Sequence, residues 1–157
     1  MDCKVDEPKE IVDAMIEQQR KLIAGYNKHD KVPEEKYLEA YHPKHAALSL
    51  SGEPTLYPKM SELLEEFHSR WMTTFLVKNG TNTDVLENLK TLPTQLYVTI
   101  IAPTKEIFEK TARPSIDDGW ERVMRTIEIL PNLDTRKVMR LTLVPEYNLV
   151  EPKKYAE

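Results

Sequence analysis

Residues 45–58 read HAALSLSGEPTLYP, and this stretch decides the predicted fold. The apolar run 46–50 is followed by Ser51, Gly52, Glu53 and Pro54, and a helical pattern begins at Pro58. A buried strand, a polar loop and a helix in this order form a βα unit, which places the polar groups of the loop at the carboxyl end of a sheet. We expect the rest of the chain to repeat this unit.

Three further apolar runs predict strands at 73–77, 96–101 and 138–144. Amphipathic patterns predict helices at 6–26, 33–41, 58–70, 84–89, from Thr104, and from Asp117 or Asp118 through Leu130, with another helix beginning in 147–157. Regular alternation of the two predicts a parallel sheet with right-handed crossovers. The continuous apolar run 73–77 is typical of a strand that is buried on both faces.

Four strands do not close a barrel of eight, so we expect an α/β fold that forms an open arc of a (βα) barrel, with helices on the outside. Both ends of the sequence look cut. We therefore expect residues 1–157 to be one partial domain, with a preceding region and the end of the barrel missing and with two unpaired outer strands.

The composition is that of a globular domain. Of 157 residues, 40% are apolar and 31% are charged, which allows both a core and a hydrated surface. No apolar run approaches the roughly 20 residues that cross a bilayer, and the N-terminus MDCKVDEPKE lacks the apolar part of a secretory signal. We expect a cytoplasmic location. A net charge of −4 is not the basic balance that nucleic-acid-binding proteins usually show.

Few residues indicate a metal site. The single cysteine, Cys3, cannot form a disulfide within the chain, a multi-cysteine zinc site or an iron–sulfur cluster by itself. His42 and His45 are three residues apart, but no third ligand follows at a recognisable spacing, so we expect loop histidines and no metal. Trp71 and Trp120 are expected to pack against the sheet.

Polar residues follow every predicted strand. The functional groups of parallel βα folds collect at the carboxyl ends of the strands, so we expect these residues to share one rim. Gly52 allows the backbone to approach a ligand closely. Glu53 offers a carboxylate to a ligand ammonium or places a negative charge at a helix N-terminus, and the spacing leaves both readings open. The four clusters are 49–54, 79–80, 99–103 and 145–148.

Several segments, taken in order, resemble the archaeal form of the radical-SAM tRNA-wybutosine enzymes, the 4-demethylwyosine synthases. They are VDEPKEIVDAMIEQQRKLIAGY (5–26), SLSGEPTLYP (49–58), EEFHSR (65–70), TTFLVKNGTNTDVLENL (73–89), PTQLYVTIIAPTKE (93–106), ARP (112–114), WERV (120–123) and RKVMRLTLVPEYN (136–148). The segments SGEPTLYP and TQLYV are the most specific.

The resemblance implies a function in wybutosine biosynthesis. The family condenses pyruvate-derived carbons with N1-methylguanosine in tRNA-Phe, using S-adenosylmethionine and a [4Fe–4S] cluster on a CxxxCxxC motif. Segment 52–54 matches the motif that holds the methionine amino group, with a serine on each side of it, and the ends of the next two strands face the nucleoside half. The cofactor-binding residues implied in this way are Ser49, Ser51, Gly52, Glu53, Pro54, Asn79 and Thr99.

The sequence also departs from this family. It contains no CxxxCxxC motif, and Ile101 stands where the family usually has an aspartate. Trp71 replaces a residue that is usually small or polar, and we assign no residue of this sequence to the lysine that forms a Schiff base in the family. We therefore expect this chain alone to be inactive, although its parent family is enzymatic, and the resemblance allows an association with a cluster-bearing segment. The alternative is a cluster-free, inactive α/β module that binds a ligand or a partner.

Overall fold

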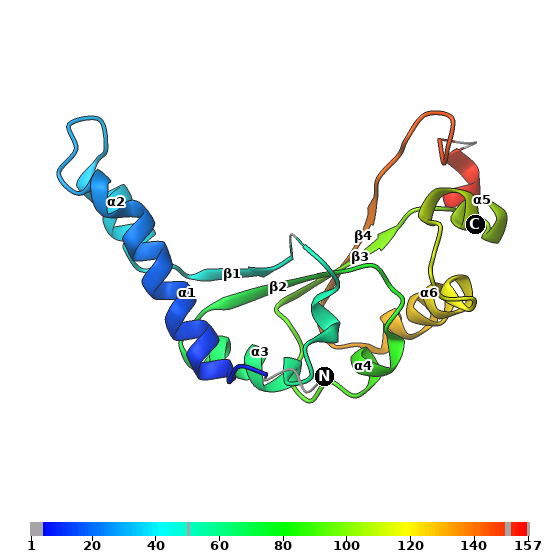
Figure 1. Cartoon of the computed structure of the whole chain (residues 1–157), viewed down its shortest axis with the longest axis horizontal. Helices are drawn as coiled ribbons and strands as arrows, with labels where there is room; N and C mark the ends of the chain where they lie inside the picture. Colours follow the sequence, from blue (N-terminus) through cyan, green and yellow to red (C-terminus); the bar gives the residue numbers. More distant parts are fainter. Residues whose placement is uncertain (1–4, 50, 150–151, 157) are drawn as a thin grey trace.

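The computed structural model describes residues 5–49, 51–149 and 152–156. Four strands form one sheet in the order β1-β2-β3-β4, and each neighbouring pair is parallel. The strands are β1 (His45–Leu48), β2 (Thr73–Lys78), β3 (Gln95–Ile100) and β4 (Arg136–Leu141). The predicted open arc of parallel strands is confirmed (Figure 1).

Every connection between neighbouring strands contains a helix. α3 (Met60–Ser69) joins β1 to β2, α4 (Thr83–Glu87) joins β2 to β3, and α5 (Lys105–Ala112) and α6 (Gly119–Ile129) join β3 to β4. Thr104 accepts a hydrogen bond from the Ile107 amide and so caps α5, which explains why this helix begins there. α6 begins after Asp118, whose carboxylate pairs with Arg122 at 2.8 Å instead of capping the helix.

The core lies between the sheet and the helices. Leu64 and Phe67 of α3 are fully buried together with Leu76 of β2 and Leu96 of β3. The expectation that β2 is buried on both faces is wrong. Burial alternates along β2, so that Thr74, Leu76 and Lys78 are buried while the intervening residues are half-exposed. In the described part of the chain, no second layer covers the inner face of the arc.

Two helices precede the sheet. α1 (Pro8–Ile23) and α2 (Glu34–Tyr41) form a hairpin, with the short 3-10 turn η1 (Ala24–Tyr26) at the end of α1. Arg20 donates to the Tyr41 carbonyl at 3.2 Å and fastens the two helices together. Figure 1 shows this hairpin extending beyond the end of the sheet at which the strands begin.

Some boundaries and contacts differ from expectation. β4 begins and ends earlier than predicted, and the closing segment contains the 3-10 turn η4 (Pro152–Tyr155) instead of an α-helix. Trp71 does not pack against the sheet: it is 88% exposed and has a φ of +58°, because it forms the tight turn from α3 into β2. Trp120 packs against Phe108, with ring centroids 5.8 Å apart. Cys3 and Leu50 lie outside the described residues.

No helix in the described ranges is long and apolar enough to span a bilayer.

Candidate functional site at the carboxyl ends of the strands

The loop after β1 contains the SGEP motif, and its conformation depends on glycine. Gly52 has a φ of +77°, a region that side chains other than glycine rarely adopt. The 3-10 turn η2 (Pro54–Leu56) follows directly. The Glu53 carboxylate begins this turn, because its Oε1 accepts from the Thr55 amide at 3.2 Å and from the Thr55 hydroxyl at 2.5 Å. Glu53 therefore places its negative charge at the N-terminus of a helical turn, as one of the two interpretations expected, although this turn is a short 3-10 turn.

Glu53 also joins this loop to the loop after β2. Its second carboxylate oxygen, Oε2, accepts from the Asn79 amide at 2.8 Å. Asn82 donates in return from its side chain to the Thr55 carbonyl at 3.0 Å. Glu53 and Asn79 therefore emerge on the same side of the molecule, as the shared rim requires.

A pocket of about 420 Å³ lies at this rim. Its lining includes Glu53, Asn79 and Thr99, together with Ile101 and Arg122. We call it the strand-end pocket. Thr99 is held in place by Arg140, whose guanidinium donates to the threonine hydroxyl at 3.1 Å.

The strand-end pocket brings together only some of the predicted residues. Ser49, Ser51 and Gly52 are exposed in the loop before it, and Pro54 begins η2 behind Glu53. None of these four lines the pocket. Of the last predicted cluster, Asn148 is only 1% exposed, and its side chain donates to the carbonyls of Ile101 at 2.7 Å and Thr142 at 2.8 Å. Asn148 thus fixes the ends of β3 and β4 instead of facing a ligand.

A buried cation lies beneath the SGEP loop. Lys78, the last residue of β2, is 2% exposed, and its ammonium donates to the Asn82 carbonyl at 3.2 Å. Burial lowers the pKa of Lys78 from 10.5 to about 8, and the Glu53 carboxylate opposes this shift. The loop that carries the site is therefore built over a lysine that is only weakly solvated.

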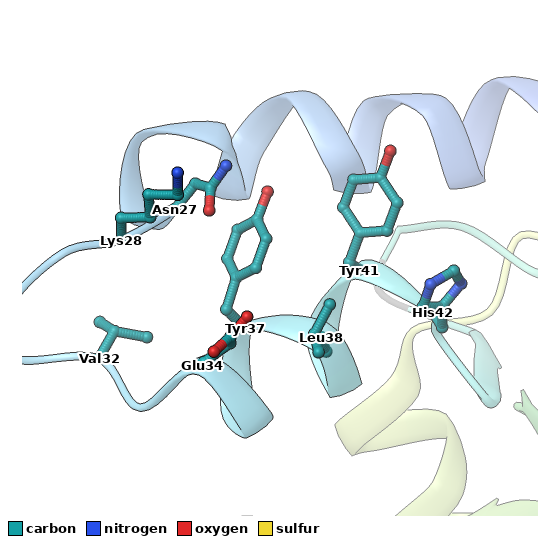
Figure 2. Close-up of a pocket in the computed structure, with 8 residues that line it drawn as sticks. All are labelled: Asn27, Lys28, Val32, Glu34, Tyr37, Leu38, Tyr41 and His42. Carbon is teal, nitrogen blue, oxygen red and sulfur yellow. The ribbon is translucent and has the colours of Figure 1, made fainter.

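A second cavity lies elsewhere. It measures about 530 Å³ and lies along the α1–α2 hairpin, where Figure 2 shows Tyr37 of α2 beside Asn27 and Lys28, and Tyr41 further along the same helix. The Arg20 guanidinium covers the Tyr41 ring at 4.7 Å. Because the hairpin extends from the opposite end of the sheet, this cavity is not part of the rim (Figures 1 and 2).

Comparison with known families identifies the fold. Residues 4–157 match the radical SAM superfamily. The chain belongs to this superfamily.

The curated relatives confirm the resemblance to the wybutosine enzymes. The S-adenosyl-L-methionine-dependent tRNA 4-demethylwyosine synthase of Pyrococcus abyssi is 52% identical over 155 residues, which cover 97% of this chain and 45% of that protein. The synthase of Saccharomyces cerevisiae is 37% identical over 156 residues, which cover 98% of this chain and 19% of that protein. This radical SAM chain thus spans about half the length of the archaeal relative, or less of longer ones.

Solved structures agree. A crystal structure of archaeal TYW1 superposes with a TM-score of 0.85 at 37% identity, over 99% of this chain and 53% of that one. A structure of TYW1 with a bound lysine–pyruvate adduct superposes with a TM-score of 0.83 at 39% identity, over 94% of this chain and 49% of that one. The predicted radical-SAM type of partial barrel is confirmed.

The two cofactors of the superfamily fit this radical SAM chain differently. Glu53 accepts three hydrogen bonds from the protein, and a carboxylate offers about four acceptor positions, so one remains for a donor such as a ligand ammonium. The iron–sulfur cluster does not fit. The described residues contain no group of three or more histidine, cysteine, aspartate or glutamate side chains able to hold a metal.

His42, His45 and His68 make contacts away from the strand-end pocket. His45 lies 2.6 Å from the Thr73 hydroxyl, and His68 lies 2.8 Å from the Thr74 hydroxyl. His42 lies on the hairpin cavity, beside Tyr41.

Sequence reasoning missed three residues of the site: Thr55, Lys78 and Asn82. Lys78 could have been noticed in the sequence, because it directly follows the apolar run 73–77 and a charged residue is rarely buried in a core. Thr55 and Asn82 carried no such signal: Thr55 donates to the Glu53 carboxylate within its own loop, and the Asn82 side chain donates to the Thr55 carbonyl of a different loop.

Proposed function

We propose that this chain provides the S-adenosylmethionine-binding rim of an enzyme that forms 4-demethylwyosine in tRNA. The proposed substrates are N1-methylguanosine in tRNA-Phe and pyruvate, and the proposed location is the cytoplasm. The observation that carries the proposal is the Glu53 carboxylate, which joins the SGEP loop to Asn79 and still has an acceptor position free. The similarity to the synthases over 97% of the chain supports the same function.

Each predicted residue receives a role in binding. Gly52 allows the backbone to turn beside the methionine end of the cofactor, and Glu53 would accept from its ammonium. Asn79 and Thr99 line the strand-end pocket and would face the nucleoside end. Ser49, Ser51 and Pro54 would shape the approach from the loop. These roles remain predictions.

We assign neither the iron–sulfur cluster nor the pyruvate-binding lysine of the reaction to the described residues. The cluster would come from a separate cysteine-bearing segment that associates with this chain, and we derive no step through it. No lysine lines the strand-end pocket as described, so the lysine–pyruvate adduct of the solved relative is given no counterpart here.

A chimera tests the proposal. The matching 155 residues of the Pyrococcus abyssi synthase are replaced by this chain, so that the remainder of that protein is retained. After anaerobic iron–sulfide loading, we expect the chimera to convert N1-methylguanosine in tRNA-Phe to 4-demethylwyosine when pyruvate and S-adenosylmethionine are supplied. The same chimera with Glu53→Gln should lose most of this activity. A chimera that folds and holds a cluster but does not cleave S-adenosylmethionine contradicts the proposal.

The second candidate is an inactive ligand-binding or partner-binding module, and Ile101 favours it. This hydrocarbon side chain lines the strand-end pocket where the family resemblance expects a carboxylate suited to a ribose hydroxyl. Ile101→Asp in the chimera discriminates the two functions. Activity that appears only with the aspartate indicates that the natural chain has lost the reaction.

A further inference from the structure

The buried lysine beneath the SGEP loop has no role in the function proposed above. Lys78 does not line the strand-end pocket, and burial alternates along β2 so that its side chain lies on the helical side of the sheet with Thr74 and Leu76. An ammonium has three donors, and Lys78 has one described acceptor, the Asn82 carbonyl at 3.2 Å. A neutral side chain of the same length would fill this space without the cost of desolvating a charge.

The contacts of Lys78 lead directly to the loop that carries the motif. The Lys78 ammonium donates a hydrogen bond to the carbonyl of Asn82. The side-chain amide of Asn82 in turn donates to the carbonyl of Thr55 at 3.0 Å. Thr55 and Asn79 both donate to Glu53, at 3.2 Å and 2.8 Å from their amides. The chain of contacts thus runs from the lysine through both loops to the carboxylate at the rim.

The charge of the lysine acts on the same carboxylate. Glu53 is the charged group that raises the proton affinity of Lys78 within the described part of the chain. Asp84, on the neighbouring helix α4, is exposed and paired with Arg125 at 3.0 Å. Glu53 is therefore the carboxylate whose charge acts on Lys78 in the described part of the chain, and it is also the one that joins the two loops.

We propose that Lys78 is a positioning residue: its ammonium holds the loops 51–55 and 79–82 together and keeps Glu53 oriented at the rim. Loss of its proton or of its charge loosens both loops while the sheet remains intact. The effect on cofactor binding rests on the proposed function, whereas the ordering of the loops does not.

Hydrogen exchange of the ligand-free chain tests the ordering of the loops. The readout is the protection factor of the Thr55 and Asn79 amides, corrected for the intrinsic rate at each pH. In Lys78→Met, we expect protection at both amides to fall by about tenfold near neutral pH, as expected for the loss of a charged hydrogen bond. The buried sheet amides should keep their protection. Lys90→Met, which removes an exposed lysine, is the matched control.

The pH dependence separates a role of the charge from simple packing. Between about pH 7 and about pH 9.5 the ammonium loses its proton, so wild-type protection at the two amides should fall toward that of the Met variant. Lys78→Gln, which keeps an N–H donor, should restore part of the protection. Wild-type protection in the Met variant, or the same pH dependence in both proteins, overturns the proposal.

Titration with S-adenosylmethionine connects the loops to the ligand. The ratio of the Kd of Lys78→Met to that of the wild type should be about tenfold at pH 7 and should fall at pH 9.5, where the neutral amine keeps its N–H donors but has lost its charge. Using this ratio cancels the titration of the ligand's own amino group. If the wild type binds no S-adenosylmethionine at either pH, the proposed function loses its cofactor, and hydrogen exchange still decides the role of Lys78.

Discussion

Replacing Lys78 with methionine should make the folded chain more stable near neutral pH. Burial lowers the pKa of Lys78 from 10.5 to about 8, a difference of about 2.5. At about 1.4 kcal/mol per pKa unit, the folded state pays about 3 kcal/mol to keep the ammonium charged. Methionine removes this cost. It also leaves the Asn82 carbonyl without its donor, and this loss destabilises the folded state by about 1 kcal/mol. The expected net gain at pH 7 is about 2 kcal/mol.

The dependence on pH identifies the cause. Below about pH 8 the lysine is protonated in both the folded and the unfolded state, so the full cost is present. Between about pH 8 and pH 10.5 the unfolded chain binds more protons, so the stability of the wild type rises with pH. The advantage of the Met variant should therefore shrink by about 3 kcal/mol across this range.

Urea unfolding of both proteins at several pH values measures this difference, and the titration of all other groups cancels in it. Lys90→Met is the control and should differ from the wild type by a constant amount. A stability difference for Lys78→Met that does not change between pH 7 and pH 10.5 would refute the reasoning, because the lysine would then titrate normally in the folded state.

Three other changes have expected outcomes. Trp71→Gly should raise stability by about 1 kcal/mol in urea unfolding, because Trp71 is exposed and has a φ of +58° that glycine adopts without strain; a loss of stability would contradict this account of the turn. Asn148→Ala should cost about 3 kcal/mol, because it leaves the Ile101 and Thr142 carbonyls and the Val144 amide without their partner, and an unchanged urea midpoint would show that these bonds contribute nothing. Loading the chain with iron and sulfide should yield no stoichiometric four-iron cluster, because the sequence contains one cysteine; four irons and the charge-transfer absorbance of a cluster would contradict it.

The order and direction of the strands were predictable because they depend on patterns within short segments. Apolar runs of five to seven residues, such as 73–77 and 138–144, alternating with amphipathic stretches indicate parallel βα units. The burial of β2 was not predictable in the same way. The run TTFLV (73–77) places an apolar residue on each face of the strand, and only the number of neighbouring layers decides which face is covered.

The site was predictable at the level of the rim but not of its contacts. Glycine at 52 and a carboxylate at 53 after a strand indicate a ligand loop, and the structure gives Gly52 the positive φ that only its residue type favours. The partners of Glu53 could not be deduced, because one of them is the backbone amide of Asn79 on another strand. Trp71 was misplaced for a similar reason: tertiary geometry sets the turn in which it lies.

Lys78→Met is expected to change global stability and loop protection in opposite directions, and the two changes together explain why a lysine occupies this position. Global stability should increase because a buried charge is removed, while protection of the Thr55 and Asn79 amides should decrease because two loops lose their common anchor. A side chain that served only to fill the core would give the first effect without the second, because methionine fills the same volume. A lysine needed for folding would give the second effect without the first, because its removal would lower global stability and with it the protection of all amides, the buried sheet amides included. Only a residue that costs stability in order to position the rim produces both, and unfolding and exchange measured on the same two proteins distinguish the three cases.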